Sequence, residues 1–123
     1  MLVTMTKLVE INADRLDIKI LNTALRELRY AFKIFAPYRK VRKVSIFGSA
    51  RTPETDPDYM TAFRLGELLA KNNFMVITGA GGGIMQAGHE GEGPEKSFGA
   101  NIRLPWEQSA NPVLREDRKL ISF

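Results

Sequence analysis

The sequence has 123 residues, of which 44% are hydrophobic and 26% charged, with a formal net charge of +4, and this balance is typical of a single globular domain. No apolar run approaches the roughly 20 residues of a membrane-spanning helix, and charges at Lys7, Glu10 and Asp14 argue against a signal peptide. The absence of cysteine excludes disulfides and thiolate metal sites, and we expect a cytoplasmic protein.

The first predicted element is a long amino-terminal helix from about Asn12 to Phe35. Its apolar residues recur at helical spacing and indicate an amphipathic helix that ends before Pro37: Leu21, Leu25, Leu28, Phe32 and Phe35. A basic cluster follows it, made of Arg39, Lys40, Arg42 and Lys43. No nucleic-acid-binding motif accompanies this cluster, so we interpret it as a solvated connector and expect neither a nucleic-acid nor a membrane partner.

The next elements are a strand over about 42–47 and a helix that runs to about Asn72. The strand is followed by Gly48-Ser49-Ala50-Arg51. In this segment Ser49 has a hydroxyl and Arg51 a guanidinium, and both groups can bind phosphate or ribose oxygens. Asp56 is the predicted N-cap of the helix, with Pro57 at its first position. Ala62, Leu65 and Leu69 are expected to line its inner face, and Gly66 to allow close approach to the sheet.

A glycine loop follows the predicted strand over 74–78. The loop is Gly79-Ala80-Gly81-Gly82-Gly83, and the residues after it read as the first turns of a helix. Glycines let backbone amides approach an anion closely, and the positive end of the helix faces the same place, so we predict a phosphate site here. The spacing matches neither the dinucleotide fingerprint nor the P-loop; a tight turn without a ligand is the alternative.

Histidine gives a weaker signal. The one histidine, His89, is expected to be a surface or packing residue, because no partner carboxylate is evident for general-base catalysis. One histidine without cysteine provides no ligand spacing, so we expect no metal site.

A third strand is predicted over 98–104, ended by Pro105. The alternation of helices and strands indicates an α/β protein with a Rossmann-like, doubly wound parallel sheet. We divide the chain into an amino-terminal helical segment, residues 1–40, and part of a nucleotide-binding domain, residues 41–123. Ligands of such sheets collect at the carboxyl ends of the strands, where the glycine loop and Ser49 both lie.

Three motifs are similar in order and spacing to the LOG family, Rossmann-like proteins also labelled lysine decarboxylase-like. They are Ile46-Phe47-Gly48-Ser49-Ala50-Arg51, Thr78-Gly79-Ala80-Gly81-Gly82-Gly83-Ile84-Met85-Gln86-Ala87-Gly88 and Gly99-Ala100-Asn101-Ile102-Arg103-Leu104-Pro105. The resemblance covers about residues 40–123. Characterised family members hydrolyse the N-glycosidic bond of cytokinin riboside or purine nucleoside 5′-monophosphates.

The resemblance implies an AMP-like nucleotide ligand, a homodimer and no cofactor. It implies substrate or phosphate contacts at Gly48, Ser49, Arg51, Gly81, Gly82, Gly83 and Glu107. LOG enzymes carry an Arg-Lys pair on a helix and then Pro-Gly-Gly-x-Gly-Thr-x-x-Glu at the end of the next strand; we find neither motif in this sequence and assign no catalytic residue. We therefore expect the amino-terminal half of a phosphoribohydrolase, inactive by itself, with a non-catalytic nucleotide-binding module as the alternative.

Overall fold

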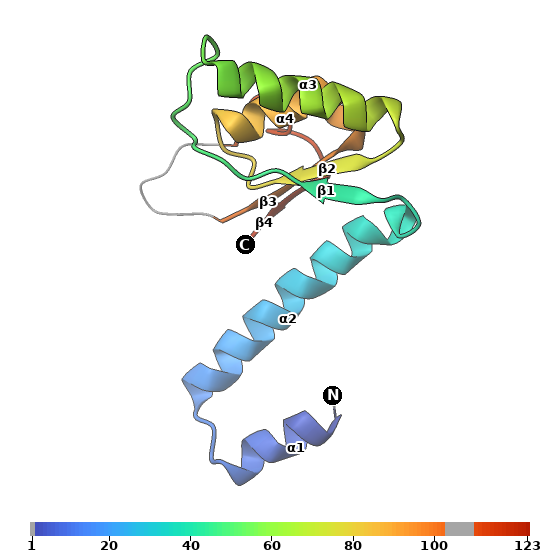
Figure 1. Cartoon of the computed structure of the whole chain (residues 1–123). Helices are drawn as coiled ribbons and strands as arrows, with labels where there is room; N and C mark the ends of the chain where they lie inside the picture. Colours follow the sequence, from blue (N-terminus) through green and yellow to red (C-terminus); the bar gives the residue numbers. More distant parts are fainter. Residues whose placement is uncertain (1, 103–109) are drawn as a thin grey trace. The chain divides into compact units, whose positions relative to one another are not determined.

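The computed structural model describes residues 2–102 and 110–123, which form two compact units, Met1–Lys33 and Ile34–Phe123 (Figure 1). The boundary that the sequence predicts after residue 40 stays a prediction. None of the helices in the described parts of the chain has the length and apolar character that crossing a bilayer requires.

The first unit consists of α1 (Leu2–Glu10) and most of α2 (Arg15–Phe35). The predicted amino-terminal helix is thus confirmed as α2, whereas α1 was not predicted. Helix α2 starts with a capping box, because Asp14 Oδ1 accepts from the amide of Asp17 at 2.8 Å and Asp17 Oδ2 accepts from the amide of Asp14 at 3.1 Å. Asn12, with φ of 52°, turns the chain between the two helices.

The second unit contains a four-stranded, all-parallel sheet in the order β1-β2-β3-β4. The strands are β1 (Lys43–Ser45), β2 (Met75–Thr78), β3 (Ser97–Asn101) and β4 (Leu120–Ser122). This confirms the α/β, Rossmann-like fold class and the three predicted strands. The final strand β4 was not predicted, and residues 103–105 at the predicted end of the third strand lie outside the described residues.

Two helices, α3 (Pro57–Lys71) and α4 (Ile84–Glu92), lie on the same side of this sheet (Figure 1). The predicted N-cap of α3 is confirmed, since the Asp56 side chain accepts from the amide of Asp58 at 2.8 Å. Short 3-10 turns at Ala36–Tyr38 and Pro94–Lys96 lead into β1 and β3. Phe98 of β3 is fully buried and stacks on Phe35 with ring centroids 4.6 Å apart.

The contact between α3 and α4 corrects two predictions about α3. Leu65 is 42% exposed, and the buried face of α3 is formed by Tyr59, Ala62 and Gly66 instead. Gly66 approaches α4 rather than the sheet, because a Cβ atom at this position would lie 2.5 Å from the carbonyl oxygen of Gly88. Small residues on both helices let the backbones touch.

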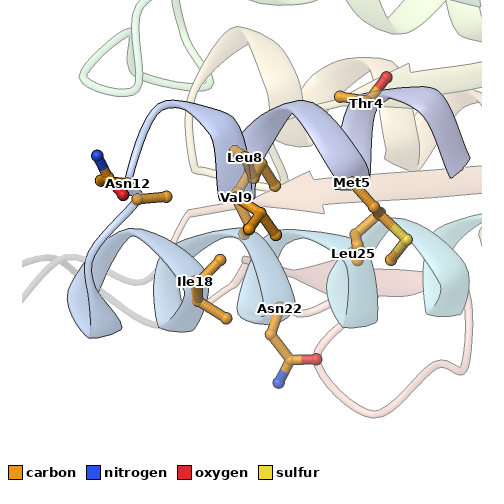
Figure 2. A pocket seen from close by; sticks show the side chains of 10 residues that line it. Thr4, Met5, Leu8, Val9, Asn12, Ile18, Asn22 and Leu25 are labelled. Atoms are coloured by element: carbon orange, nitrogen blue, oxygen red, sulfur yellow. The ribbon is translucent and has the colours of Figure 1, made fainter.

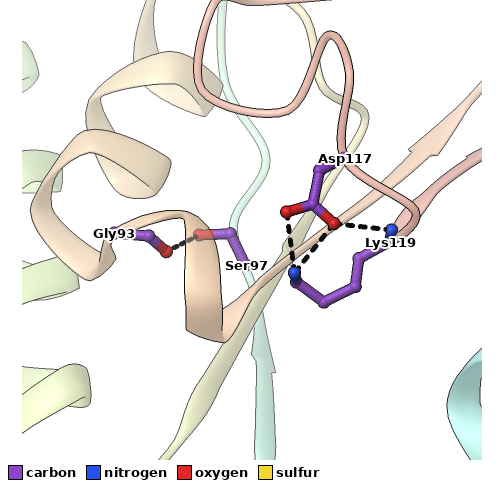
Figure 3. Close-up of polar contacts among 4 residues, drawn as sticks. All are labelled: Gly93, Ser97, Asp117 and Lys119. Atoms are coloured by element: carbon purple, nitrogen blue, oxygen red, sulfur yellow. Dashed lines mark hydrogen bonds and ion pairs between the residues drawn. The ribbon is translucent and has the colours of Figure 1, made fainter.

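Polar contacts fix the chain where β3 and β4 begin (Figure 3). The Ser97 hydroxyl donates to the carbonyl oxygen of Gly93 at 2.8 Å. The Lys119 ammonium donates to both oxygens of Asp117 at 2.8 Å. Burial raises the pKa of Asp117, but the hydrogen bonds from Lys119 outweigh it and hold the pKa below its ordinary value. The ion pair stabilises the turn that leads into β4.

Candidate functional site: a glycine loop at the strand ends

The glycine loop, residues Gly79–Gly83, joins the carboxyl end of β2 to the amino end of α4. Two of its residues have a left-handed backbone: Ala80 with φ of 59° and Gly83, the N-cap of α4, with φ of 58°. A Cβ atom on Gly83 would also collide with the carbonyl oxygen of Ser49. Glycine is therefore required at position 83 both by conformation and by space.

Hydrogen bonds from two directions hold this loop. The amide of Ala80 donates to the Thr78 hydroxyl at 2.9 Å, and the carbonyl of Ala80 accepts from the amide of Asn111 at 2.8 Å. The Asn111 side chain, 4% exposed, donates to the carbonyl oxygen of Gly81 at 3.0 Å. These bonds compensate the cost of a non-glycine residue in the left-handed region at Ala80.

His89 of α4 is fully buried behind the loop. The sequence predicted either a surface or a packing role for this residue, and its burial identifies it as a packing residue. Its Nε2 lies 3.1 Å from the carbonyl oxygen of Phe98, which can only accept, so Nε2 carries a proton. Its Nδ1 lies 3.2 Å from Asn111 Nδ2 and accepts from it. Burial lowers the pKa of His89 and keeps the ring neutral, with hydrogen bonds to Phe98 and Asn111 opposing this effect.

The predicted second loop, Gly48–Arg51, lies directly against the glycine loop. The carbonyl oxygen of Ser49 accepts from the amide of Ile84 at 3.1 Å, and a Cβ atom on Gly82 would lie 3.2 Å from the carbonyl oxygen of Ala50. Gly48 has no room for a side chain, because a Cβ atom there would lie 2.5 Å from that of Ile84. The structure thus brings Gly48 and Ser49 together with Gly82 and Gly83.

A hydrogen bond closes the turn of the Gly48–Arg51 loop. The amide of Arg51 donates to Ser49 Oγ at 3.1 Å, so the hydroxyl proton of Ser49 stays available for another acceptor. Both side chains are exposed. Glu107, the remaining predicted contact residue, lies outside the described residues.

The free amides of the glycine loop are its most informative chemical feature. Within residues 2–102 and 110–123, no hydrogen-bond acceptor meets the amides of Gly81, Gly82, Gly83, Met85 and Gln86. Gly81 and Gly82 are partly accessible to solvent. Unpaired amides at a helix N-terminus carry a positive partial charge and attract anions. The arrangement is therefore suited to binding a phosphate-sized anion.

The sequence did not predict a cluster of hydrogen-bonded side chains beside the loop, made of Tyr59, Gln86 and Glu90. Gln86 of α4 donates from Nε2 to Glu90 at 2.7 Å, and the hydroxyl of Tyr59 on α3 donates to the other Glu90 oxygen at 2.7 Å. Burial and the bond to Glu90 raise the pKa of the Tyr59 hydroxyl, so it stays protonated and donates. The spacing of Gln86 and Glu90, four residues apart on one helix, was the available signal.

Among the described residues, no group of three or more His, Asp or Glu side chains is arranged to hold a metal ion. Two hollows are lined by residues other than those of the glycine loop. One, of about 360 Å³, is lined by residues between Pro112 and Asp117. The other, of about 780 Å³, lies between α1 and α2 and is mainly apolar (Figure 2).

Comparison with models of protein families gives a match. The model of the SLOG cluster4 family matches residues 41–111, which is more than half of the chain and includes β1 to β3 with both loops of the site. SLOG is the superfamily that contains LOG-like proteins. A comparison with curated proteins finds no match.

Proposed function

We propose that this chain, which belongs to the SLOG cluster4 family, binds a nucleoside 5′-monophosphate at the glycine loop. Membership of this family suggests a nucleotide-related binding module. The observation that carries this proposal is the set of five free amides from Gly81 to Gln86. A phosphate accepts several hydrogen bonds at once, and each charge-assisted bond contributes about 1.5–3 kcal/mol. Phosphate is therefore the ligand group that these amides fit best.

The Gly48–Arg51 loop supplies further groups for the same ligand. The Ser49 hydroxyl is exposed next to Gly83, where it is available to donate to a phosphate or ribose oxygen. Arg51 is exposed in the same loop and would add a positive charge. In parallel sheets, ligands bind outside the carboxyl ends of the strands, where both loops lie.

Hydrolysis of the N-glycosidic bond to free base and ribose 5-phosphate is the finer proposal, and the LOG resemblance is what supports it. Such a reaction needs a group that positions or activates water and cationic stabilisation of the ribosyl phosphate. In LOG enzymes an Arg-Lys pair on a helix and a Pro-Gly-Gly-x-Gly-Thr-x-x-Glu motif serve this purpose. The two Arg-Lys pairs of this chain, Arg39-Lys40 and Arg118-Lys119, lie in turns rather than on a helix, and the Pro-Gly-Gly-x-Gly-Thr-x-x-Glu motif does not occur in the 123 residues. We assign hydrolysis to a protein that carries those motifs, and binding to these residues.

Calorimetric titration with AMP tests the binding proposal. We expect the parent chain to bind AMP and the Gly82→Val variant to bind at least about tenfold more weakly, because a branched side chain would stand among the free amides, near the carbonyl of Ala50. Gly82→Ala is the milder variant, since its Cβ atom at 3.2 Å from Ala50 requires only a small shift. The matched control is Lys40→Ala on the basic connector, which should keep the parent affinity.

Circular dichroism separates loss of binding from loss of fold. A Gly82→Ala variant that keeps the parent helix content and melting temperature but binds more weakly supports the proposal. Equal affinity of the parent, Gly82→Ala and Gly82→Val for AMP would contradict it, as would the absence of AMP binding by the folded parent chain.

A further inference from the structure

The direction of each peptide group in the glycine loop decides whether its amide can reach an anion. In a trans peptide, the carbonyl of one residue and the amide of the next point in opposite directions. No cis peptide bond occurs within residues 2–102 and 110–123. The direction of a free amide is therefore set by the group that holds the carbonyl of the preceding residue.

Asn111 holds the carbonyls of two successive loop residues. Its backbone amide donates to the carbonyl oxygen of Ala80 at 2.8 Å, and its side-chain Nδ2 donates to that of Gly81 at 3.0 Å. Because both carbonyls point toward the buried Asn111, the amides of Gly81 and Gly82 point away from it. Successive amides that point the same way form an anion-binding concavity.

The loop sequence does not fix this direction by itself. The peptide group between Gly81 and Gly82 joins two glycines, which adopt positive and negative φ almost equally well. Inverting this group would therefore cost little backbone strain. The inverted group would present the carbonyl oxygen of Gly81 to a ligand in place of the amide of Gly82, and a carbonyl oxygen repels an anion. A donor outside the loop is needed to select the orientation that binds.

His89 fixes which end of the Asn111 side chain faces the loop. Nδ1 of His89 accepts from Asn111 Nδ2 at 3.2 Å, because the ring proton lies on Nε2, next to the carbonyl oxygen of Phe98. Asn111 Nδ2 thus uses one hydrogen for His89 and the other for Gly81. Rotating the side-chain amide would place its Oδ1 against these two acceptors. Asn111 Oδ1 has no hydrogen-bond partner among the described residues, so the side chain acts here as a donor.

We propose that Asn111 is a positioning residue of the anion site, and that its side chain selects the orientation of the Gly81–Gly82 peptide in which the amide of Gly82 is available to the ligand. This inference rests on the proposed function of the glycine loop. Both donor groups of Asn111 are used within the protein and its Oδ1 is buried, so Asn111 acts through the loop and does not touch the ligand. Its side chain controls Gly82, whereas its backbone controls Gly81.

Amide hydrogen exchange of the ligand-free, ¹⁵N-labelled chain tests this role in the Asn111→Asp variant. Aspartate has nearly the same shape but no hydrogen to donate to Gly81. We expect its carboxylate to accept from the amide of Gly82 instead, so that the peptide group inverts. The amide of Gly82 should then exchange at least about tenfold more slowly than in the parent. The amide of Gly81 should be unchanged, because the backbone of residue 111 still holds Ala80.

The Asn111→Ala variant removes the donor without adding a charge. In a titration with inorganic phosphate, the amide shift of Gly82 should respond at most about half as strongly as in the parent, while that of Gly81 still responds, because only the Gly81–Gly82 peptide is released. The matched control is Leu114→Ala, which truncates a fully buried residue of the same segment. It should lower the melting temperature but keep the Gly82 response and the parent affinity for AMP.

Three outcomes would overturn the role of Asn111. The first is a folded Asn111→Asp variant in which Gly82 exchanges as in the parent. The second is an Asn111→Ala variant whose Gly82 amide responds to phosphate as the parent does. The third is a Leu114→Ala variant that loses as much of the Gly82 response as Asn111→Ala, which would show a general effect of stability. Absence of AMP and phosphate binding by the parent would overturn the proposed function instead, since the exchange of Gly82 is measured without ligand.

Discussion

We expect the Glu92→Gln variant to be more stable than the parent chain above neutral pH. Glu92, the last residue of α4, is 7% exposed, and both oxygens of its carboxyl group are buried without a hydrogen-bond partner in the part of the chain that the structure describes. Burial raises its pKa to about 7, with the positive charge of Lys96 opposing the shift. Lys96 itself donates to the carbonyl oxygen of Ala70 at 2.9 Å rather than to Glu92.

The size of the effect follows from this pKa. In the unfolded chain the carboxyl group titrates near 4.5, so the folded state binds the proton more tightly. The contribution of Glu92 to the free energy of unfolding therefore falls as the pH rises from 4.5 through about 7, and it is constant above that pH. At about 1.4 kcal/mol per pKa unit, ionised Glu92 lowers the free energy of unfolding by at most about 3 kcal/mol. Glutamine mimics the protonated form at every pH.

Urea unfolding followed by circular dichroism measures this difference. The free energy of unfolding of Glu92→Gln should equal that of the parent near pH 4 and exceed it by about 2–3 kcal/mol at pH 8. His89, whose lowered pKa affects stability in the opposite sense below pH 6.5, contributes equally to both proteins and cancels. The exposed Glu95 provides the control, Glu95→Gln. A constant difference between pH 4 and pH 8 would refute the reasoning.

Three further predictions concern the stability of the glycine loop and the activity of the chain toward AMP. Gly83→Ala should lower the free energy of unfolding by at least about 2 kcal/mol in urea titrations, because alanine would adopt a left-handed backbone and strike Ser49; an unchanged midpoint would contradict this. Asn111→Ala should cost about 1–3 kcal/mol, because it removes the donor to Gly81 and His89, and should weaken AMP binding as the loop loosens; unchanged AMP affinity would contradict the second part. Incubation of the chain with AMP should release no free adenine above a no-protein blank in chromatography, and sustained turnover would show that the catalytic groups were misplaced.

The parts of the fold that were predictable have strong local signals. The strand-loop-helix order around Gly79–Gly83 follows from a short apolar run, a cluster of glycines and the helical residues after them. The start of α3 follows from Asp56 and Pro57. In each case a few neighbouring residues determine the local backbone, so one sequence is sufficient.

The missed elements depend on tertiary contacts or weak propensity. Strand β4 has only three residues, Leu120–Ser122, and exists because it pairs with β3. Helix α1 contains several β-branched residues, which lower helix propensity. The misassigned face of α3 has a similar cause: Gly66 packs on the backbone of α4, so Tyr59 and Ala62 turn inward in place of Leu65.

For the candidate site, the sequence predicted which backbone segments meet but not the side chains that hold them. Gly48, Ser49 and the three glycines 81–83 were expected at the ends of neighbouring parallel strands, and they do lie there. The bonds from Asn111 to the loop and to His89 join residues about 20 to 30 positions apart, and no local pattern specifies them. Whether this site binds a phosphate is the central question.

Amide chemical shifts measured during titration with inorganic phosphate, and then AMP, test that claim most directly. With the chain labelled with ¹⁵N, we predict that the shifts that respond to both ligands are those of the five free amides, Gly81, Gly82, Gly83, Met85 and Gln86, with smaller changes at Ser49. The same titration of Gly82→Val should leave these amides unresponsive while the remaining spectrum shows a folded protein. Shifts confined to Arg39, Lys40, Arg42 and Lys43, with the glycine loop unaffected by either ligand, would contradict the account.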